Sequence, residues 1–457
     1  MATSTPTAPK TKKILLLGSG FVAGPCADYL ARDPANVLTV ACRTHASASA
    51  FCAALPAGAS ATALALDVSD TAALEAAVAA HDLVISLIPY TYHAAVVEAA
   101  IKSKTHVVTT SYISPAMRAL DDRARAAGIV VLNEAGLDPG IDHLWAVKVI
   151  DEVHAKGGKV KQFLLHCGAL PAPECSDNPL GYRFSWSPRG GLLALLNPAH
   201  YISGGAVKHV PGPELMTSAT PLAIGAFAFE MFPNRDSVPF REFYRIPEAE
   251  TVLRGTLRYV GFTAFMAALV KLGWLAMDVK EWLANGLEWR EVMQRACGAS
   301  ASDEATLIVQ IKQLCAFPSE YESTRIIDGL RWMGLFSAEK VAVRNGTLLD
   351  TLCGRLEVLM KYEPGQRDLV IMQQKYVVEW QDGREETIVT TLEAYGKPNG
   401  PSAMALTVGL PCGIATQLVL DGVINTPGIL APYSKEICDP IRAKLESEGL
   451  GMTQEIL

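Results

Sequence analysis

The ten cysteines of this 457-residue chain show no CxxC pair and no regular spacing. Zinc sites need ligand pairs at short, repeated intervals, and His166-Cys167 with Cys175 beyond them does not supply a second pair. Scattered cysteines are typical of reduced thiols that pack as small apolar side chains. We therefore expect neither a disulfide framework nor a metal site.

The chain also lacks an excess of basic residues and a long apolar run. Its formal net charge is −7, whereas nucleic-acid-binding domains carry clustered lysine and arginine. The most apolar stretch, 262–270, ends at Lys271, short of the ~18 residues that a membrane span needs. Residues 1–12 have no apolar core or cleavage site of a signal peptide. We expect no nucleic-acid partner, no membrane span, a disordered tail over 1–12 and a cytoplasmic location.

Between residues 13 and 135, short apolar runs alternate with alanine-rich stretches. The runs have the length of buried parallel strands, and the stretches between them have helical composition. The runs lie at 14–17, 38–41, 63–66, 83–88, 106–109 and 129–132. This alternation predicts an α/β fold whose N-terminal domain is a Rossmann-type, doubly wound parallel sheet.

The rest of the chain predicts a second, α+β domain for substrate binding and dimerisation, built from 136–260 and 363–396. We expect a helix near 141–154, a strand over 159–166, and a β-hairpin whose strands, 367–380 and 385–395, flank a turn at 381–384. Apolar residues recur at helical spacing over 261–362, which indicates a mostly helical insertion for packing and subunit contact. Segment 397–457, with an apolar helix at 402–420, is expected to return to the first domain.

A glycine-rich turn follows the first predicted strand. Its sequence, Gly18-Ser19-Gly20-Phe21-Val22-Ala23, has the spacing Gly-x-Gly-x-x-Ala and opens a helix. In that context Gly18 permits a tight turn and Gly20 lets the backbone approach a pyrophosphate, whose charge the helix N-terminus favours. We interpret the turn as a dinucleotide-binding site, although the glycine pattern without this context would be an ordinary tight turn.

The end of the second predicted strand indicates which dinucleotide binds. Arg43 stands where an NAD-selective site places an acid to hold the ribose 2′-hydroxyl. A guanidinium pairs with a 2′-phosphate, and Thr44 is a nearby donor, so the sequence favours NADP(H). Asp67, at the end of the third strand, has two interpretations, a contact to adenine or a cap for the next turn.

Three further loops follow the fourth, fifth and sixth predicted strands. They are 88–90, 109–112 and 136–140, with sequences IPY, TTSY and GLDPG. Ligands bind outside the carboxyl ends of the strands in open parallel sheets, so we expect nicotinamide and substrate at these loops. Taken alone, Pro89 more commonly ends a strand and the string DPG more commonly forms a turn. A long aromatic-rich loop, 168–189, is expected to close over the ligands.

Together these segments resemble the saccharopine reductases, the glutamate-forming saccharopine dehydrogenases of the α-aminoadipate route to lysine. The resemblance covers nearly the whole chain and rests on GSGFVAGP, VACRT, DLVISLIPYTYH, HVVTTSYISPAM, NEAGLDPGIDH, LPAPECSDNPLGYRFSWS, PNRDS and RGTLRY. It implies that saccharopine, NADP⁺ and water are converted reversibly to L-glutamate, 2-aminoadipate 6-semialdehyde and NADPH. It also implies a homodimer.

The resemblance assigns residues to two sites. The NADP site would comprise Gly18, Ser19, Gly20, Phe21, Val22, Ala41, Cys42, Arg43, Leu66, Asp67, Thr109, Thr110, Gly136, Leu137 and Trp186. The substrate site would comprise Ser111, Tyr112, Asp138, Arg235, Thr256, Leu257 and Arg258.

The chemistry of such a reaction suits these residue types. Saccharopine is a tricarboxylate, for which Arg235 and Arg258 would serve as bidentate clamps. The proton transfers at nitrogen and oxygen need a group for which Asp138, Tyr112 and Cys167 are candidates. Asp138 would act either as general acid and base or as a partner for the substrate ammonium, and Cys167 either as a reactive thiol or as a core cysteine.

Two alternatives stay open at this point. One is another amino-acid dehydrogenase of this architecture, of the opine type or the lysine-forming type, against which Arg43 and the TTSY and GLDPG loops weigh. The other is a regulatory or redox-sensing protein that binds NADP without catalysing a reaction. Such a protein would need no arginine clamp for carboxylates.

Overall fold

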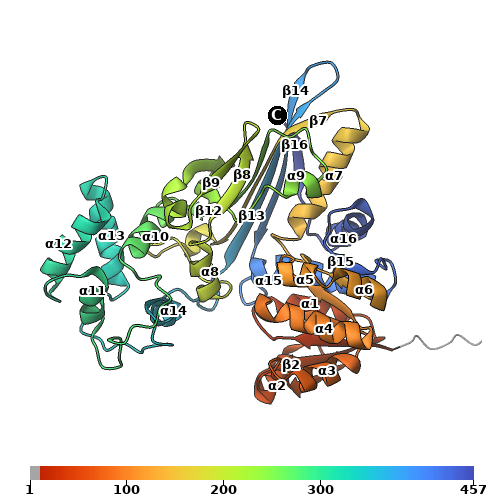
Figure 1. The fold of residues 1–457 in the computed structure, drawn as a ribbon, viewed down its shortest axis with the longest axis horizontal. Helices are drawn as coiled ribbons and strands as arrows, with labels where there is room; N and C mark the ends of the chain where they lie inside the picture. The colour runs from red at the N-terminus through yellow and green to blue at the C-terminus, as the bar shows by residue number, and fades with distance from the viewer. Residues whose placement is uncertain (1–10) are drawn as a thin grey trace, which may run out of the picture. The chain divides into compact units, whose positions relative to one another are not determined.

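The computed structural model describes residues 11–457. Of the tail expected over 1–12, residues 1–10 lie outside the described residues. The chain forms two compact units. The first runs up to Lys159 and adds Trp380–Arg384 and Thr390–Ile456, and the second comprises Val160–Glu379, Glu385–Val389 and Leu457. Both units are therefore built from segments that are far apart in the sequence (Figure 1).

A seven-stranded parallel sheet forms the centre of the first unit. Its order is β15-β6-β5-β4-β1-β2-β3. The bounds are β1 Lys12–Leu17, β2 Asn36–Cys42, β3 Ala61–Ala65, β4 Leu83–Ser86, β5 His106–Thr109, β6 Val130–Leu132 and β15 Gly428–Leu430. All six predicted strands are present, which confirms the doubly wound sheet.

Several details of this sheet differ from the prediction, most of them strand ends. Strand β3 begins two residues earlier than expected and ends at Ala65, and β4 ends at Ser86 rather than at residue 88. Leu87 and Ile88 continue the apolar run beyond the end of the strand, although the Leu87 N–H still donates to the Leu17 carbonyl of β1 at 3.0 Å. Strand β15 was missed because three residues are too few to show a period.

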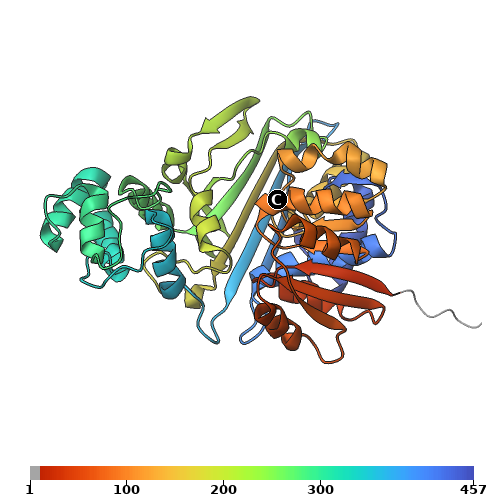
Figure 2. The same cartoon turned by 60° about the horizontal axis from the view of Figure 1, so that its bottom comes forward.

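Helices cover both faces of this sheet (Figure 2). The helices of the first unit are α1 Ala23–Leu30, α2 His45–Ala54, α3 Thr71–Ala79, α4 His93–Ser103, α5 Pro115–Arg118, α6 Asp121–Ala127, α7 Ile141–Ala155, α15 Ala403–Leu420 and α16 Lys435–Ser447. Leu15 and Leu17 of β1 share a core with α3, α4 and α6. Helices α1 and α15 pack against each other, and α15 also contacts β4 and β5.

Helix α15 is an 18-residue apolar helix, which corrects the expectation that no apolar run of the chain approaches the length of a membrane span. By length and composition alone it would suffice to cross a membrane, but 78% of it is buried within the structure, as in a core helix. Gly409 and Gly413 allow its close approach to α1. A Cβ atom at Gly409 would overlap the carbonyl oxygen of Val22, and one at Gly413 would lie 3.0 Å from that of Cys26. Helix α15 thus packs directly against the start of α1.

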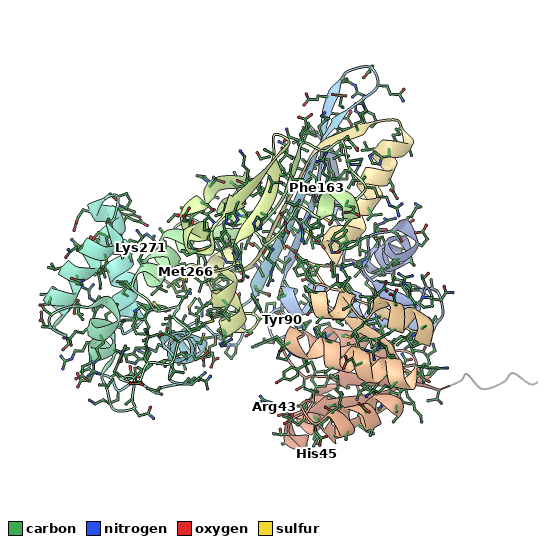
Figure 3. The ribbon with its side chains drawn as sticks, in the orientation of Figure 1. Arg43, His45, Tyr90, Phe163, Met266 and Lys271 are labelled. Atoms are coloured by element: carbon green, nitrogen blue, oxygen red, sulfur yellow. The ribbon has the colours of Figure 1, made fainter. Side chains whose placement is uncertain are left out.

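A second sheet has nine strands, seven of them in the order β10-β11-β12-β7-β13-β14-β16, while β8 pairs with β12 and with β9. The bounds are β7 Lys159–Pro171, β8 Ala199–Ser203, β9 Ala206–Val210, β10 Thr220–Ile224, β11 Phe227–Pro233, β12 Thr251–Tyr259, β13 Asp368–Glu379, β14 Glu385–Tyr395 and β16 Thr453–Ile456. Phe163 of β7 is fully buried, with its ring 5.4 Å from that of Tyr376 (Figure 3). Strand β7 continues to Pro171, so the first residues of the loop expected over 168–189 are strand instead.

The insertion is helical, as the apolar spacing predicted. Its helices are α10 Phe262–Lys271, α11 Trp289–Cys297, α12 Glu304–Cys315, α13 Glu320–Trp332 and α14 Leu348–Leu359. They share one hydrophobic core with α8 Pro188–Ala194. Met266 of α10 is buried in this core, and Lys271, the last residue of the helix, donates a side-chain hydrogen bond of 2.9 Å to the Cys315 carbonyl of α12 (Figure 3).

Candidate active site

The turn after β1 has the conformation that its glycines require. Gly18 has a φ of 99°, in the left-handed region that favours glycine, and a Cβ atom there would lie 3.0 Å from the Leu87 carbonyl oxygen. Its N–H donates to the Ala41 carbonyl at 2.9 Å, which joins the turn to the end of β2. Helix α1 then begins at Ala23, without a side-chain cap on its first N–H groups. The Ala23 N–H donates to the Gly20 carbonyl at 3.1 Å and Pro25 has no N–H, but no side chain occupies the N-terminus of the helix, which leaves it open to a phosphate.

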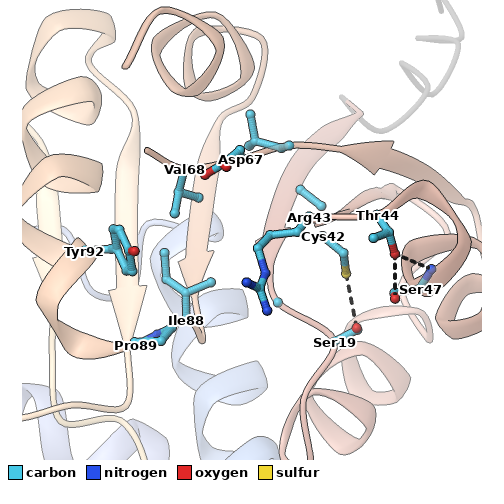
Figure 4. A pocket seen from close by; sticks show the side chains of 13 residues that line it. Ser19, Cys42, Arg43, Thr44, Ser47, Asp67, Val68, Ile88, Pro89 and Tyr92 are labelled. Carbon is cyan, nitrogen blue, oxygen red and sulfur yellow. Dashed lines mark hydrogen bonds between the residues drawn. The ribbon is translucent and has the colours of Figure 1, made fainter. Parts of the chain in front are cut away.

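A pocket of about 610 Å³ lies above this turn at the carboxyl ends of the strands (Figure 4). This volume is typical of a cofactor site. Seven of the predicted cofactor residues line it: Gly18, Ser19, Ala41, Cys42, Arg43, Leu66 and Asp67. The lining is completed by Thr44, Ser47, Val68, Ile88, Pro89 and Tyr92. Val68 and Tyr92 were missed, although both come shortly after predicted strands, which was the available signal.

Arg43 provides the positive charge of the pocket. Its side chain extends from the end of β2 toward the pocket (Figure 4), and among residues 11–457 it has no salt-bridge or hydrogen-bond partner. Thr44 instead caps α2 by accepting from the Ser47 N–H at 3.3 Å. Hydrogen bonds from Ser69 hold the pKa of exposed Asp67 below its ordinary value, with a smaller contribution from the charge of Arg43. The guanidinium is thus available to an anionic ligand.

The loops after β4 and β5 are joined by a buried histidine. His93, the first residue of α4, is 1% exposed, and Ser86 of β4 is 0% exposed. The Nδ1 atom of His93 lies 2.9 Å from Ser86 Oγ, and its Nε2 atom lies 2.9 Å from Ser111 Oγ. Burial lowers the pKa of His93 to about 4, so its ring is neutral at physiological pH.

Two of the three candidate proton-transfer residues lie in contact. The Tyr112 hydroxyl donates a hydrogen bond of 2.7 Å to Asp138 Oδ1, and both residues are half-buried. Cys167 belongs to the second unit, where it is buried on β7 and lies beside Thr256 in the parallel register with β12. The first unit thus presents a tyrosine–aspartate pair, and the second unit presents the thiol.

Glu134, at the end of β6, connects the loops that carry this pair. Its buried carboxylate accepts hydrogen bonds from His143 Nε2 at 3.0 Å, from the Tyr433 hydroxyl at 2.7 Å and from the Ile113 N–H at 3.1 Å. Burial opposes its ionisation, but the bond and charge of His143 and the other donors together hold the pKa of Glu134 below its ordinary value. Sequence reasoning missed Glu134 because its partners are distant in the chain.

The remaining cofactor candidates of the first unit lie in the turn after β1 and in the loops after β5 and β6. The Thr109 side chain is fully buried and accepts from the Ser111 N–H at 3.1 Å, so its hydroxyl shapes the loop. A Cβ atom added to Gly136 would lie 3.3 Å from the Thr110 side chain. The Leu137 side chain is buried. Phe21 is 66% exposed at the turn.

The second unit holds the other predicted residues. Arg258 of β12 is buried, with its guanidinium carbon 4.8 Å from the centre of the Tyr182 ring, and its Nη1 donates to the Leu257 carbonyl at 2.6 Å. Its Nε atom has no hydrogen-bond partner among the described residues. The Leu257 side chain is fully buried, Arg235 is exposed with a φ of 55°, and Trp186 is half-buried against the glycines of α8.

Within the part of the chain that the structure describes, no group of three or more histidine, cysteine, aspartate or glutamate side chains could hold a metal ion. The parallel sheet, the glycine turn and the arginine of the pocket instead define a dinucleotide-dependent oxidoreductase that uses NADP(H).

Comparisons with known proteins identify the family. Residues 14–132 match the model of the saccharopine dehydrogenase NADP binding domain, and residues 136–450 match that of the saccharopine dehydrogenase C-terminal domain. The chain belongs to the saccharopine dehydrogenase family.

Its relatives cover nearly the whole chain. The saccharopine dehydrogenase (NADP(+), L-glutamate-forming) of Schizosaccharomyces pombe is 52% identical over 97% of this chain and 99% of that protein. The protein of the same name from Saccharomyces cerevisiae is 53% identical over 96% of this chain and 97% of its own length. The solved structure of the apo, histidine-tagged saccharopine dehydrogenase (L-Glu forming) from Saccharomyces cerevisiae matches with a TM-score of 0.89 and 51% identity, covering 98% of this chain and 100% of that one.

Replacing Arg43 by aspartate tests the choice of cofactor. We expect the Kd for NADPH to rise about 10- to 100-fold, because a charge-assisted bond to the 2′-phosphate is lost and a like charge is introduced. The Kd for NADH should change far less. Both constants are measured by fluorescence titration, with Arg32→Ala, an exposed residue that pairs with Glu448, as the control. An equal loss for both dinucleotides would refute this account of Arg43.

The charge of Glu134 should make the free energy of unfolding depend on pH in the acid range. Because the folded-state pKa is lowered, its contribution is fully present above the ordinary pKa of 4.5 and is lost as the pH falls through the folded pKa. Glu134→Gln should lower the free energy of unfolding at neutral pH by about 3 kcal/mol and flatten its decline in acid. Denaturant unfolding across this pH window measures both, with exposed Glu98→Gln as the control. Parallel pH curves for the wild type and Glu134→Gln would contradict this prediction.

Proposed function

We infer that this enzyme converts saccharopine, NADP⁺ and water reversibly to L-glutamate, 2-aminoadipate 6-semialdehyde and NADPH, a reaction of lysine biosynthesis. The observation that carries this conclusion is identity of about half the residues, over nearly the full length, with proteins named for the glutamate-forming reaction. The pocket supports it because Arg43 offers a cation where the 2′-phosphate would bind.

The chain's own residues suit the binding of the cofactor. The turn at Gly18 and the open N-terminus of α1 would hold the pyrophosphate, and Arg43 would hold the 2′-phosphate. When bound, NADPH supplies the hydride that reduces the imine formed between glutamate and the aldehyde. The loops after β5 and β6 would then present Ser111, Tyr112 and Asp138 to the substrate.

The tyrosine–aspartate pair suits the proton transfers of this reaction. Asp138 accepts a hydrogen bond from Tyr112, and its carboxylate can bind the substrate ammonium and take its proton. The proton taken by Asp138 can then pass to the Tyr112 oxygen while Tyr112 gives its own proton to a leaving hydroxyl, which departs as water. Cys167 remains the third candidate, on the second unit.

Arginine side chains of the second unit suit the carboxylates of saccharopine. Arg258 is held over the rings of Tyr182 and Phe262, which limits its conformations, and its Nε–H has no partner among residues 11–457. A rigid guanidinium with an unused donor is suited to bidentate binding of a carboxylate. Arg235 would provide a second, more exposed contact.

The likeness to the family also supports a proposal about the oligomeric state and the cellular location of the enzyme. We propose a homodimer located in the cytoplasm, with small-molecule substrates and neither a nucleic-acid nor a membrane partner. Burial of α15 within the structure supports the last point.

A direct assay tests the reaction. Purified protein is mixed with NADPH, L-glutamate and the semialdehyde, and the absorbance of the reduced nicotinamide is followed. We expect it to fall, and to rise in the reverse direction with saccharopine and NADP⁺. Tight binding of NADPH with unchanged absorbance would favour a regulatory protein without catalytic activity instead.

Replacing Arg258 tests the carboxylate clamp. We expect Arg258→Ala to raise the KM for saccharopine and glutamate by about 10- to 100-fold, with the Kd for NADPH unchanged, because a charge-assisted bidentate contact is lost. Arg258→Lys should recover part of this loss, since it restores the charge without the planar fork. Exposed Arg290→Ala, which breaks a surface pair with Glu288, is the control. Unchanged KM values in folded Arg258→Ala would exclude the clamp.

A further inference from the structure

The buried series Ser86–His93–Ser111 has no role in the mechanism described so far. Both nitrogen atoms of His93 are engaged, Nδ1 with Ser86 Oγ and Nε2 with Ser111 Oγ, at 2.9 Å each. The ring is 1% exposed, and no acidic residue is hydrogen-bonded to it. His93 therefore serves as a neutral connection between two hydroxyl groups.

The hydrogen-bonding requirements of Ser86 set the direction of this series. Ser86 is fully buried, and among residues 11–457 its hydroxyl oxygen has no partner other than His93. A buried hydroxyl donates its proton where an acceptor is available, so Ser86 donates to Nδ1. A neutral imidazole carries one proton, which must then lie on Nε2. The Nε2–H group donates to Ser111 Oγ.

The proton of Ser111 must consequently point away from His93. Ser111 is half-buried at the end of β5, and its Oγ atom has no other partner among the described residues. The next residue, Tyr112, donates to Asp138. A hydrogen-bond donor and a carboxylate acceptor thus flank the place where the proposed function puts the amino-acid substrate.

We propose that His93 is a positioning residue that fixes Ser111 as a hydrogen-bond donor to a carboxylate of the amino-acid substrate. The proposal rests on the proposed function. A carboxylate can only accept and an ammonium can only donate, so Ser111 selects the carboxylate while Asp138 selects the ammonium. The two side chains together orient the α-amino-acid group in one direction. The low pKa of His93 keeps this arrangement unchanged at neutral pH.

Two substitutions distinguish the roles of the two nitrogen atoms of His93, because each places an amide nitrogen at the position of only one of them. The amide nitrogen of glutamine reaches the position of Nε2 and can still donate to Ser111, whereas that of asparagine reaches only the position of Nδ1. We expect His93→Asn to raise the KM for glutamate and saccharopine by about tenfold, as Ser111→Ala should. His93→Gln should stay within about threefold of the wild type, and the Kd for NADPH should hardly change in any of them.

A double variant shows whether His93 acts through Ser111. In a Ser111→Ala background, His93→Asn should add no further increase in KM, because the hydroxyl that it positions is already absent. Additive effects of the two changes would overturn the proposal. If His93→Asn does not fold, as judged by thermal unfolding, Ser86→Ala replaces it. That change removes the donor to Nδ1 and should give a KM between those of the wild type and Ser111→Ala.

The protonated nitrogen atom can also be observed without an activity assay. Nitrogen NMR of histidine-labelled protein, with His93→Gln to assign the signal, should show Nε2–H at neutral pH. A proton on Nδ1 would refute the inferred direction.

The outcomes distinguish this inference from the proposed function. A wild-type protein that does not turn over saccharopine refutes the function. An active wild type in which Ser111→Ala raises the KM but folded His93→Asn does not refutes the role of His93 alone. An active enzyme with an unchanged KM in Ser111→Ala removes Ser111 from the substrate site, and the inference with it.

Discussion

The carboxylate of Glu134 is buried at the end of β6, and the arrangement of the site depends on satisfying it. A buried charge without donors would cost several kcal/mol, so the chain must bring three donors to it. They come from the loop after β5, from α7 and from the segment after β15, as Ile113, His143 and Tyr433. The three donors that satisfy the Glu134 carboxylate therefore also hold together the loops that carry Tyr112 and Asp138.

The hydrogen-bonding groups of the first unit differ in what they can accept or donate. Arg43 is only a donor and faces the pocket, Asp138 is an acceptor, and Ser111 is turned into a donor by a neutral histidine. An α-amino acid carries the groups complementary to Asp138 and Ser111, an ammonium and a carboxylate, on the same carbon atom. Orientation of the substrate can thus follow from proton positions that are set in the protein interior, before any ligand arrives.

Much of this could be predicted from the sequence where the signal is local. Buried strands are recognisable as apolar runs, and the glycine turn and Arg43 follow them directly, so the cofactor pocket was largely anticipated. Contacts between distant segments could not be predicted in this way. The hydrogen bond between Glu134 and Tyr433 joins residues that are far apart in the sequence, and the position of Cys167 beside Thr256 depends on the register of two strands. His93 is the last residue of the motif DLVISLIPYTYH, but only the fold shows that its ring is hydrogen-bonded to two serines. The roles of the predicted substrate residues remain predictions, since a sequence contains no ligand.

The contact between α1 and α15 has a consequence for the order of events during synthesis on the ribosome. Helix α1 leaves the exit tunnel early, with the apolar face formed by Ala23, Cys26, Ala27 and Leu30 still uncovered. Its partner, α15, is translated only after nearly all of the second unit. The second unit can therefore complete its fold first, which reverses the usual N-terminal-first order, and the nascent nucleotide-binding half is the part that needs protection from aggregation.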